Sequence, residues 1–202
     1  MEQQNNAIPQ HVVVFPDGNR RWAREKGLSV FEGYKEGREN FWRVLSCCKS
    51  RGIKIVTTFG FSTENWSRPK DEIEFLMKFL EETLSEKEYL KEFQEHGICV
   101  RVIGQKEKLP LSLQKAILDV ERLTAQNKEL YLNLAVSYGG RWDITQAVQR
   151  IAREGVAPEG ITEELLASHL STAGLLEPDL VIRAGGEKRF SNFLLWQSAY
   201  AE

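Results

Sequence analysis

The chain has 202 residues, of which 42% are hydrophobic and 28% charged, with a formal net charge of −2. This length and composition predict one globular domain over residues 1–202 with a substantial core, and the balanced charge gives no sign of a nucleic-acid partner. No apolar run approaches the about 18 residues that a membrane span needs, and residues 1–10 hold no signal-peptide core. Cys47, Cys48 and Cys99 are too few for a disulfide framework or zinc site, so we expect buried thiols.

A buried strand is predicted over residues 11–15, where three consecutive valines precede Phe15. Pro16 ends it because proline cannot donate to a sheet ladder. Asp17-Gly18-Asn19 is typical of a turn, and a short helix follows up to Lys26. A strand, a turn and a helix in this order can present N–H groups to a phosphate, and Asp17 suits a divalent cation that the phosphate shares. An ordinary capped turn with solvated arginines fits the same residues, so this stretch alone favours neither interpretation.

The rest of the chain alternates helical and strand patterns. Strands are predicted over residues 53–60, 98–103, 130–136 and 179–183, and helices over 34–50, from Pro69 to before Gly97, over 111–125, after Arg141 and after Thr162. This alternation predicts an α/β fold with a central, mostly parallel sheet flanked by helices. Asp71 and Glu72 suit the positive end of the helix after Pro69. Apolar positions expected to face the core include Leu113, Ala116, Ile117, Val120, Leu123, Ala147, Val148 and Ile151.

Polar or glycine-rich turns follow four of the predicted strands, at residues 17–21, 62–69, 137–141 and 184–193. Because the carboxyl ends of parallel strands meet at one edge of a sheet, these turns are expected to share one anionic ligand. Arg183, Arg189 and Ser191 can bracket a diphosphate, although surface ion pairs would use the same residues. The apolar stripe of the helix after Pro69 suits either core or the wall of a greasy tunnel; it comprises Ile73, Leu76, Met77, Leu80 and Leu84.

Four motifs together resemble those of the cis-prenyltransferases, with the undecaprenyl diphosphate synthase branch as the best match. They read Asp17-Gly18-Asn19-Arg20-Arg21-Trp22, Phe61-Ser62-Thr63-Glu64-Asn65-Trp66-Ser67-Arg68-Pro69, Tyr138-Gly139-Gly140-Arg141 and Arg183-Ala184-Gly185-Gly186-Glu187-Lys188-Arg189-Phe190-Ser191-Asn192-Phe193. The resemblance runs in order from His11 to Glu202 and implies an undecaprenyl diphosphate synthase-like fold. It also implies an isoprenyl transferase that uses Mg²⁺ to condense isopentenyl diphosphate with an allylic diphosphate such as farnesyl diphosphate, giving a Z-polyprenyl diphosphate for lipid-carrier synthesis.

The same resemblance assigns roles to individual residues. Asp17 would be the essential carboxylate and a Mg²⁺ ligand, Glu202 a second carboxylate linked to the metal, and Asn65 the residue at the proton-acceptor position. The allylic diphosphate would be held by Gly18, Asn19, Arg20 and Arg21, with Trp22 and Tyr34 beside it. The reaction centre would be lined by Ser62, Thr63, Glu64, Asn65, Trp66 and Arg68. Isopentenyl diphosphate would be bound by Arg183, Arg189, Phe190 and Ser191.

The chain departs from the family pattern at several positions. Tyr34 stands where the family usually has His, and it cannot carry a positive charge near neutral pH. Val30 replaces a residue that is often basic, and Ser137 replaces the usual Asn before Tyr138. Relatives continue beyond Glu202, so a C-terminal segment of the family is expected to be missing. A metal ligand on the last residue would be poorly held.

The resemblance further implies a homodimer in the cytoplasm or at the membrane periphery, whose product partitions to the membrane. Three alternatives stay open: a short-chain or branching prenyl diphosphate synthase, a non-catalytic partner subunit, and an unrelated phosphate-binding enzyme. Partner subunits lack the motif carboxylate, which this chain keeps as Asp17, and the Gly-x-x-x-x-Gly-Lys-Ser/Thr loop of nucleoside triphosphatases is absent. Product length depends on the depth of the tunnel behind Gly60 and is not readable from the sequence.

Overall fold

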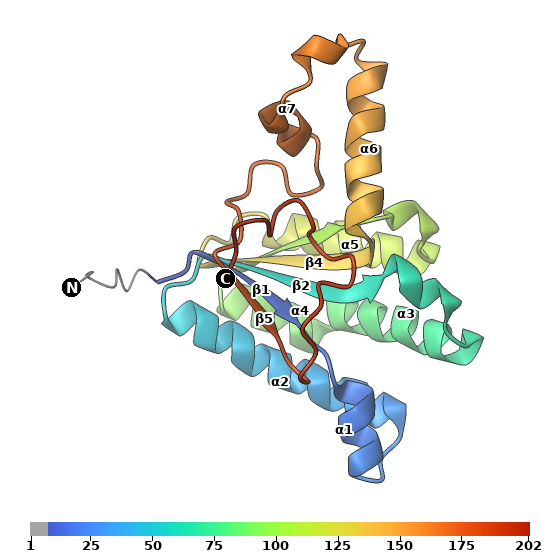
Figure 1. Cartoon of the computed structure of the whole chain (residues 1–202). Coiled ribbons are helices and arrows are strands. Elements are labelled where there is room, and N and C mark those ends of the chain that lie inside the picture. The colour runs from blue at the N-terminus through green and yellow to red at the C-terminus, as the bar shows by residue number, and fades with distance from the viewer. Residues whose placement is uncertain (1–7) are drawn as a thin grey trace, which may run out of the picture.

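The computed structural model describes residues 8–202, so most of the N-terminal stretch without a signal-peptide core lies outside it. Five strands form one sheet in the order β3-β4-β2-β1-β5, and all neighbouring pairs are parallel (Figure 1). The strands are β1 (His11–Phe15), β2 (Ile55–Ser62), β3 (Ile98–Ile103), β4 (Leu130–Tyr138) and β5 (Leu180–Arg183). The predicted parallel α/β fold is confirmed, with β2 displaced toward the C-terminus relative to its predicted bounds of 53–60.

The helices are α1 (Asn19–Glu25), α2 (Val30–Ser50), α3 (Lys70–Ser85), α4 (Lys87–Glu95), α5 (Leu111–Thr124), α6 (Gly140–Arg153) and α7 (Glu163–Ser168). Helix α2 begins earlier than predicted because Ser29 and Glu32 form a reciprocal capping box at its first turn. The single helix predicted between Pro69 and Gly97 is wrong. The extended backbone of Glu86, with ψ 138°, separates α3 from α4.

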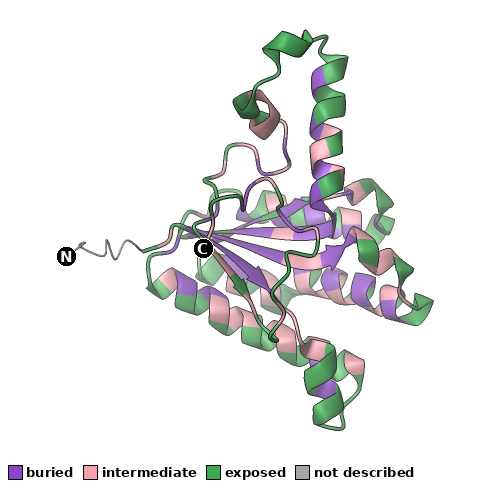
Figure 2. Cartoon of the chain, viewed as in Figure 1, coloured by how far each residue is buried: buried purple, intermediate pink, exposed green. Residues whose placement is uncertain are grey.

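The two faces of the sheet are covered differently. Alternate residues of β1 point to opposite faces, so Val12 and Val14 join a large core with α2, α3, α4 and α5. Val13 and Phe15 join a smaller core that Phe193 and neighbouring residues of the C-terminal segment complete. Figure 2 shows that the strands are largely buried, whereas α6 and α7 project from the sheet with exposed surfaces. The larger core therefore lies between the sheet and the helices α2 to α5.

Three burial predictions are wrong. Leu123 is 45% exposed because Thr124 takes the inward position of α5, where its hydroxyl bonds to Val120 O and to the Val100 amide. Val148 is 47% exposed because Ala147 and Ile151 form the packed face of α6. Cys47 is exposed and Cys99 is half-buried, so only Cys48 is a buried thiol.

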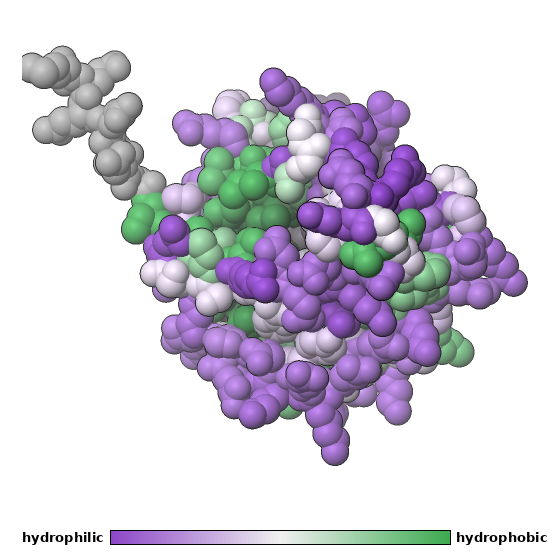
Figure 3. Space-filling view, turned by 90° about the horizontal axis from the view of Figure 1, so that it is seen from below, coloured by the Kyte–Doolittle hydropathy of each residue, from purple (hydrophilic) through white to green (hydrophobic). Residues whose placement is uncertain are grey.

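The face of the molecule that Figure 3 shows is mostly hydrophilic, with apolar side chains gathered in one main patch at its upper left. Strand β5 is an edge of the sheet, and Ile182 on it is 46% exposed. Among the helices of residues 8–202, none combines the length and apolar character that crossing a membrane requires.

His11 is buried at the start of β1 in a closed set of hydrogen bonds. Its Nδ1 lies 2.7 Å from Leu176 O and its Nε2 lies 2.7 Å from Thr57 Oγ1, which also accepts a bond from Asn133 Nδ2. The carbonyl partner fixes the proton on Nδ1, so Nε2 accepts the bond from Thr57. Burial lowers the pKa of His11 below its usual 6.5, while the Leu176 bond and the Asp179 charge oppose the shift. The folded protein therefore keeps a neutral imidazole.

We expect the free energy of unfolding to fall as the pH drops below about 6.5. In that range the His11 imidazole binds a proton in the unfolded chain but stays neutral in the folded protein. Urea titrations at pH 7.5 and 5.5 measure this loss, and a His11→Gln variant should lose less stability between the two pH values. The half-buried His169 has a raised pKa, owing to its bonds to Leu165 O and Glu154, so it contributes in the opposite direction. An identical pH dependence in wild type and His11→Gln would contradict the prediction.

Candidate active site

Four strand ends meet at one edge of the sheet, as the sequence predicts. The strands β4, β2, β1 and β5 are consecutive neighbours, so the polar turns that follow them lie side by side. The turns after β1, β2 and β5 open onto a cavity of about 680 Å³, whereas the predicted fourth turn, at residues 137–141 after β4, does not line it. Its polar lining comprises Asp17, Asn19, Tyr34, Arg38, Thr58, Ser62, Glu64, Asn65, Arg68, Thr83, Arg183, Ser191 and Asn192. A second, 620 Å³ groove lies on the other side of the Asp17 turn, between α1 and α2.

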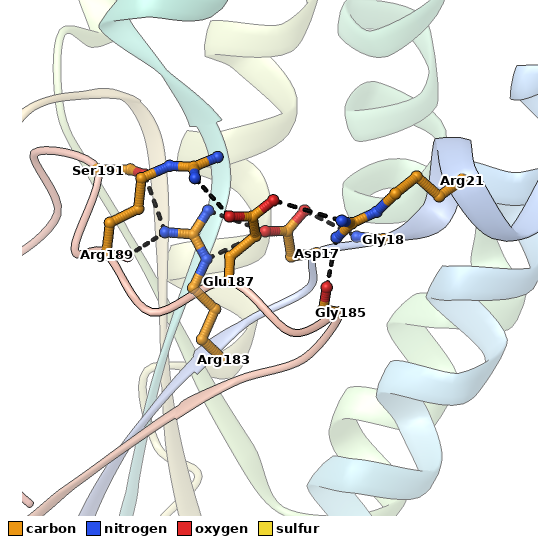
Figure 4. A network of polar contacts seen from close by, with 8 residues as sticks. All are labelled: Asp17, Gly18, Arg21, Arg183, Gly185, Glu187, Arg189 and Ser191. Carbon is orange, nitrogen blue, oxygen red and sulfur yellow. Dashed lines mark hydrogen bonds and ion pairs between the residues drawn. The ribbon is translucent and has the colours of Figure 1, made fainter.

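Asp17 follows β1 and is held from two sides (Figure 4). Its Oδ1 accepts the Gly18 N–H at 2.7 Å, and its Oδ2 accepts bonds from Arg183 Nε at 3.0 Å and Nη2 at 2.8 Å. Burial alone would raise the pKa of Asp17, but the bonds from Arg183 and Gly18, with the charges of Arg183 and Arg21, outweigh it and lower that pKa. The carboxylate is therefore ionised throughout the neutral range.

The Asp17 turn and the loop after β5 touch through two glycines. Gly18 has φ 93°, in the left-handed region that favours glycine. A Cβ on Gly185 would lie 3.4 Å from Gly18 Cα and 2.8 Å from Arg21 Nη2. The same Arg21 nitrogen donates to Gly185 O at 2.5 Å. The missing side chains thus let the two loops approach closely enough for Asp17 to reach Arg183.

The loop after β5 carries a chain of charged contacts that Figure 4 displays. Arg183 Nη1 donates to Ser191 Oγ at 2.8 Å and to Arg189 O. Glu187 accepts from Arg189 and, at 3.3 Å, from Arg21. Sequence reasoning missed Glu187, which stands between two arginines predicted to bind diphosphates. An incoming anion would compete with this carboxylate for both cations.

The turn after β2 is a short 3₁₀-helix, Thr63–Ser67, closed by a capping box. Asn65 Oδ1 accepts the Ser62 N–H at 3.1 Å, and Ser62 Oγ accepts the Asn65 N–H at 3.2 Å. Trp66 donates from Nε1 to Ser137 Oγ at 2.9 Å. Ser137 has φ 51°, a left-handed conformation that asparagine adopts more readily than serine.

Asn192 joins three of the four turns, and its role was not predicted. Its carbonyl oxygen accepts the Gly140 N–H, its Oδ1 accepts the Arg141 N–H at 2.9 Å, and its Nδ2 donates to Glu64 Oε1 at 2.8 Å. Burial would raise the pKa of Glu64, but the bond from Asn192 and bonds within its own turn lower it. The only sequence signal was the place of Asn192 beside Ser191 in the same motif.

A second unpredicted residue, Glu72, lies in the first turn of α3 and is only 6% exposed. Its Oε1 accepts bonds from Tyr34 at 2.9 Å and Arg68 at 3.0 Å, and its Oε2 lies 3.5 Å from Arg20 Nη1. Burial raises the pKa of Tyr34 to about 12, against the charge of Arg68 and with help from the bond to Glu72. Tyr34 is therefore a neutral hydrogen-bonding group at neutral pH.

The inner part of the cavity is apolar. Its lining includes Phe41, Trp42, Leu45, Leu76, Phe79, Leu80, Leu84, Phe93, Leu132 and Leu134. Of the predicted α3 stripe, Leu76, Leu80 and Leu84 line the cavity, whereas Ile73 and Met77 do not. Gly60 also lines it, at a bulge where β2 has an extra residue against β4. The cavity is thus polar at the strand ends and apolar in its interior.

The predicted site residues fall into three groups. Nine line the cavity: Asp17, Asn19, Tyr34, Ser62, Glu64, Asn65, Arg68, Arg183 and Ser191. Gly18, Arg21 and Trp22 line the second groove, and Arg20, Thr63, Trp66, Arg189 and Phe190 line neither. Glu202 lies apart from Asp17 within one chain, because its backbone pairs with Asp179 and Val181 before the end of β5.

Asp17 is the residue in the cavity lining that was predicted to bind Mg²⁺. Within residues 8–202, no group of three or more His, Cys, Asp and Glu side chains is placed to hold a metal ion. Mg²⁺ needs no such group, since it is usually held by one or two carboxylates, water and substrate phosphates. Asp17 offers one ionised carboxylate at the mouth of the cavity, with arginines positioned for an anion, and so fits a Mg²⁺ that arrives with a diphosphate.

Comparison with known proteins agrees with this geometry. Residues 15–202 match the family model described as "Putative undecaprenyl diphosphate synthase". The chain is 43% identical, over 98% of its length and 84% of the relative's, to the ditrans,polycis-undecaprenyl-diphosphate synthase of Legionella pneumophila. It is 43% identical, over 98% of its length and 79% of the relative's, to an isoprenyl transferase of Neisseria gonorrhoeae.

Solved structures give the same answer. Lavandulyl diphosphate synthase from Lavandula x intermedia, in complex with dimethylallyl diphosphate, superposes with a TM-score of 0.91 at 39% identity, covering 96% of this chain and 85% of that one. A probable undecaprenyl diphosphate synthase from Campylobacter jejuni superposes with a TM-score of 0.79 at 35% identity, covering 98% of this chain and 84% of that one. The fold, the motif-bearing turns and these matches agree, and the chain belongs to the undecaprenyl diphosphate synthase family of prenyl-transferring enzymes.

Proposed function

We propose that this protein condenses isopentenyl diphosphate with an allylic diphosphate such as farnesyl diphosphate and forms a Z-polyprenyl diphosphate. The observation that supports it most is the two-part cavity, with Asp17, Arg68 and Arg183 at its mouth and an apolar interior. Such a shape suits a ligand with an anionic head and a hydrocarbon tail. The names of the relatives match this reaction class.

The first chemical task is to let the allylic diphosphate leave. Negative charge builds on the leaving group, so preorganised donors at its position lower the barrier. Arg20 and Arg21 on α1 and Arg68 after the Thr63–Ser67 turn supply such donors beside the cavity mouth. Bound through Asp17 and the diphosphate, Mg²⁺ would neutralise part of the same charge. Glu72 helps to position both arginines, since it accepts a hydrogen bond from Arg68 and forms an ion pair with Arg20.

The second task is to place isopentenyl diphosphate against the allylic carbon and remove a proton. Arg183, Arg189 and Ser191 form the proposed binding site of its diphosphate, on the loop next to Asp17. Asn65 lines the cavity, and its bond to the Ser62 N–H fixes the orientation of its amide. An amide is a poor base, so we assign Asn65 to orienting the substrate or relaying its proton to diphosphate.

One assay tests the proposed function. Purified protein is incubated with Mg²⁺, labelled isopentenyl diphosphate and allylic primers of different length, and the products are separated by chromatography. Elongated products that require both substrates and Mg²⁺ are expected. No incorporation of label with any primer would reject the proposal and favour a non-catalytic partner subunit.

Short-chain or branching chemistry is the second candidate. The likeness to a lavandulyl diphosphate synthase in complex with dimethylallyl diphosphate favours it, as does a cavity of only about 680 Å³. Dimethylallyl diphosphate offered as the only substrate separates the two candidates, since product formed without isopentenyl diphosphate indicates branching. Formation of a homodimer, a cytoplasmic location and release of product to a membrane remain predictions of the family resemblance.

Gly60→Leu is expected to shorten the product while sparing the first condensation. An added Cβ would lie 2.9 Å from Leu134 Cδ1 and 3.3 Å from Ala135 O, so the new side chain must push Leu134 into the cavity that both residues line. Overpacking of this kind costs about 1–3 kcal/mol of stability, which a thermal melt reports. Product chromatography gives the chain length.

The control is the double variant Gly60→Leu with Leu134→Ala, which removes the displaced side chain. It should recover longer products if obstruction is the cause. A folded, active Gly60→Leu enzyme with the wild-type product distribution would place the growing chain elsewhere.

A further inference from the structure

A charged side chain lies in the wall of the apolar part of the cavity. Arg38 lines the cavity one helical turn beyond Tyr34 on α2, and only 15% of its side chain is exposed. Its Cζ lies 4.5 Å from the ring centroid of Phe79 and 4.4 Å from that of Tyr89. A guanidinium is planar and weakly hydrated, so it can lie between two rings.

Arg38 has few polar partners. Its Nη1 donates to Thr83 Oγ1 at 3.3 Å, and its Nε lies 3.5 Å from Glu39 Oε1. The Nε atom is buried and has no hydrogen-bond partner among residues 8–202. The two aromatic rings are therefore the main contacts that hold the side chain across the wall.

The rings belong to a longer aromatic row. Phe79 stacks on Phe75 with centroids 5.6 Å apart, and Tyr89 lies parallel to Trp42 at 6.4 Å. These residues come from α2, α3 and α4, which pack into one core on the same side of the sheet (Figure 1). Arg38 occupies the place between the α3 rings and the α4 ring. It thus fills the row between Phe79 of α3 and Tyr89 of α4.

We propose that Arg38 limits product length: clamped between Phe79 and Tyr89, it closes the cavity wall where α2 faces the break between α3 and α4. This inference rests on the proposed function. Each methylene of a prenyl chain that leaves water tightens binding about fourfold. A chain that extends against a guanidinium with few hydrogen bonds must instead desolvate that cation, which offsets the gain.

The test compares Arg38→Ala, Arg38→Met and the exposed α2 control Lys35→Ala with the wild type. Arg38→Ala opens the wall, so its products should be longer by at least one isoprene unit. Arg38→Met keeps the bulk of the side chain but lacks the charge and is easily displaced, so it should give a smaller shift in the same direction. Lys35→Ala should leave the distribution unchanged. The rate of the first condensation should not change in Lys35→Ala.

A binding series gives a readout that does not need turnover. Calorimetry with Mg²⁺ and n-alkyl diphosphates of increasing length should show affinity rising about fourfold per methylene until the tail reaches the closed wall. The length at which the rise stops should be greater for Arg38→Ala than for the wild type. A Tyr89→Leu variant removes one ring of the clamp and should move the same limit part of the way.

The outcomes are distinct. Folded variants with wild-type products and an unmoved length limit overturn the role of Arg38, and so do shorter products. If Arg38→Ala does not fold, Arg38→Met decides by the same two measurements. A wild-type protein that incorporates no isopentenyl diphosphate overturns the proposed function instead, while the binding series still decides whether Arg38 limits the tail.

Discussion

Asp17→Ala is expected to abolish turnover, with kcat lower by about 10³-fold or more, because a bound metal ion contributes several kcal/mol to stabilising the departing charge. Asp17 stands at the mouth of the cavity, with its pKa lowered, and it contributes one carboxylate to the proposed Mg²⁺ site. The measurement is kcat over a range of Mg²⁺ concentrations, since weaker binding alone would be recovered at high Mg²⁺.

A structural loss has to be separated from the chemical one. Asp17 also neutralises Arg183, whose side chain is only 13% exposed, so its removal leaves a partly buried cation without its carboxylate. Asp17→Asn keeps the shape and a carbonyl acceptor for the Gly18 N–H, and a thermal melt of both variants reports the cost to folding. Asp119→Ala, an exposed carboxylate on α5, is the matched control. A stable Asp17→Ala protein with most of the wild-type kcat would refute the mechanism.

The sequence predicted the sheet and the meeting of its turns because both follow from local patterns. Strand β1 is a run of β-branched residues closed by Pro16, and its polar turn follows at once. Parallel order then places that turn beside those of β2 and β5, with the turn of β4 one strand further on. The alternation of strands and helices along the sequence, together with the common direction of the strands, was enough to predict that these turns meet.

Local patterns do not report contacts between residues far apart in the sequence, so the roles that depend on such contacts were not predicted. Glu72 fits the positive end of a helix, and only its contacts with Tyr34 and Arg20 turn it inward. The break between α3 and α4 at Glu86 contains neither Pro nor Gly, the residues that usually indicate a helix end. In the sequence, Arg38 is indistinguishable from a solvated surface charge. Only the structure shows that it packs between Phe79 and Tyr89, which lie far along the chain. Tertiary packing set each of these features.

Arg189→Ala is expected to raise the KM for isopentenyl diphosphate by about 10- to 150-fold, since a charge-assisted hydrogen bond is worth roughly 1.5–3 kcal/mol. The KM for the allylic primer should change far less. Arg189 is 65% exposed and is paired with Glu187 in the absence of substrate, so removing it disturbs little packing. Steady-state kinetics with each substrate varied in turn give the two values.

The control must allow for the Glu187 carboxylate, which two arginines share. Glu187 also pairs with Arg21 on the opposite side, so the loss of Arg189 leaves Glu187 to bind Arg21 alone. That effect would reach the allylic primer, and the double variant Arg189→Ala with Glu187→Gln removes it. Arg24→Ala, an exposed arginine on α1, should change neither KM. Equal increases for both substrates in the single and the double variant would mean that Arg189 shapes the loop after β5 and does not bind isopentenyl diphosphate.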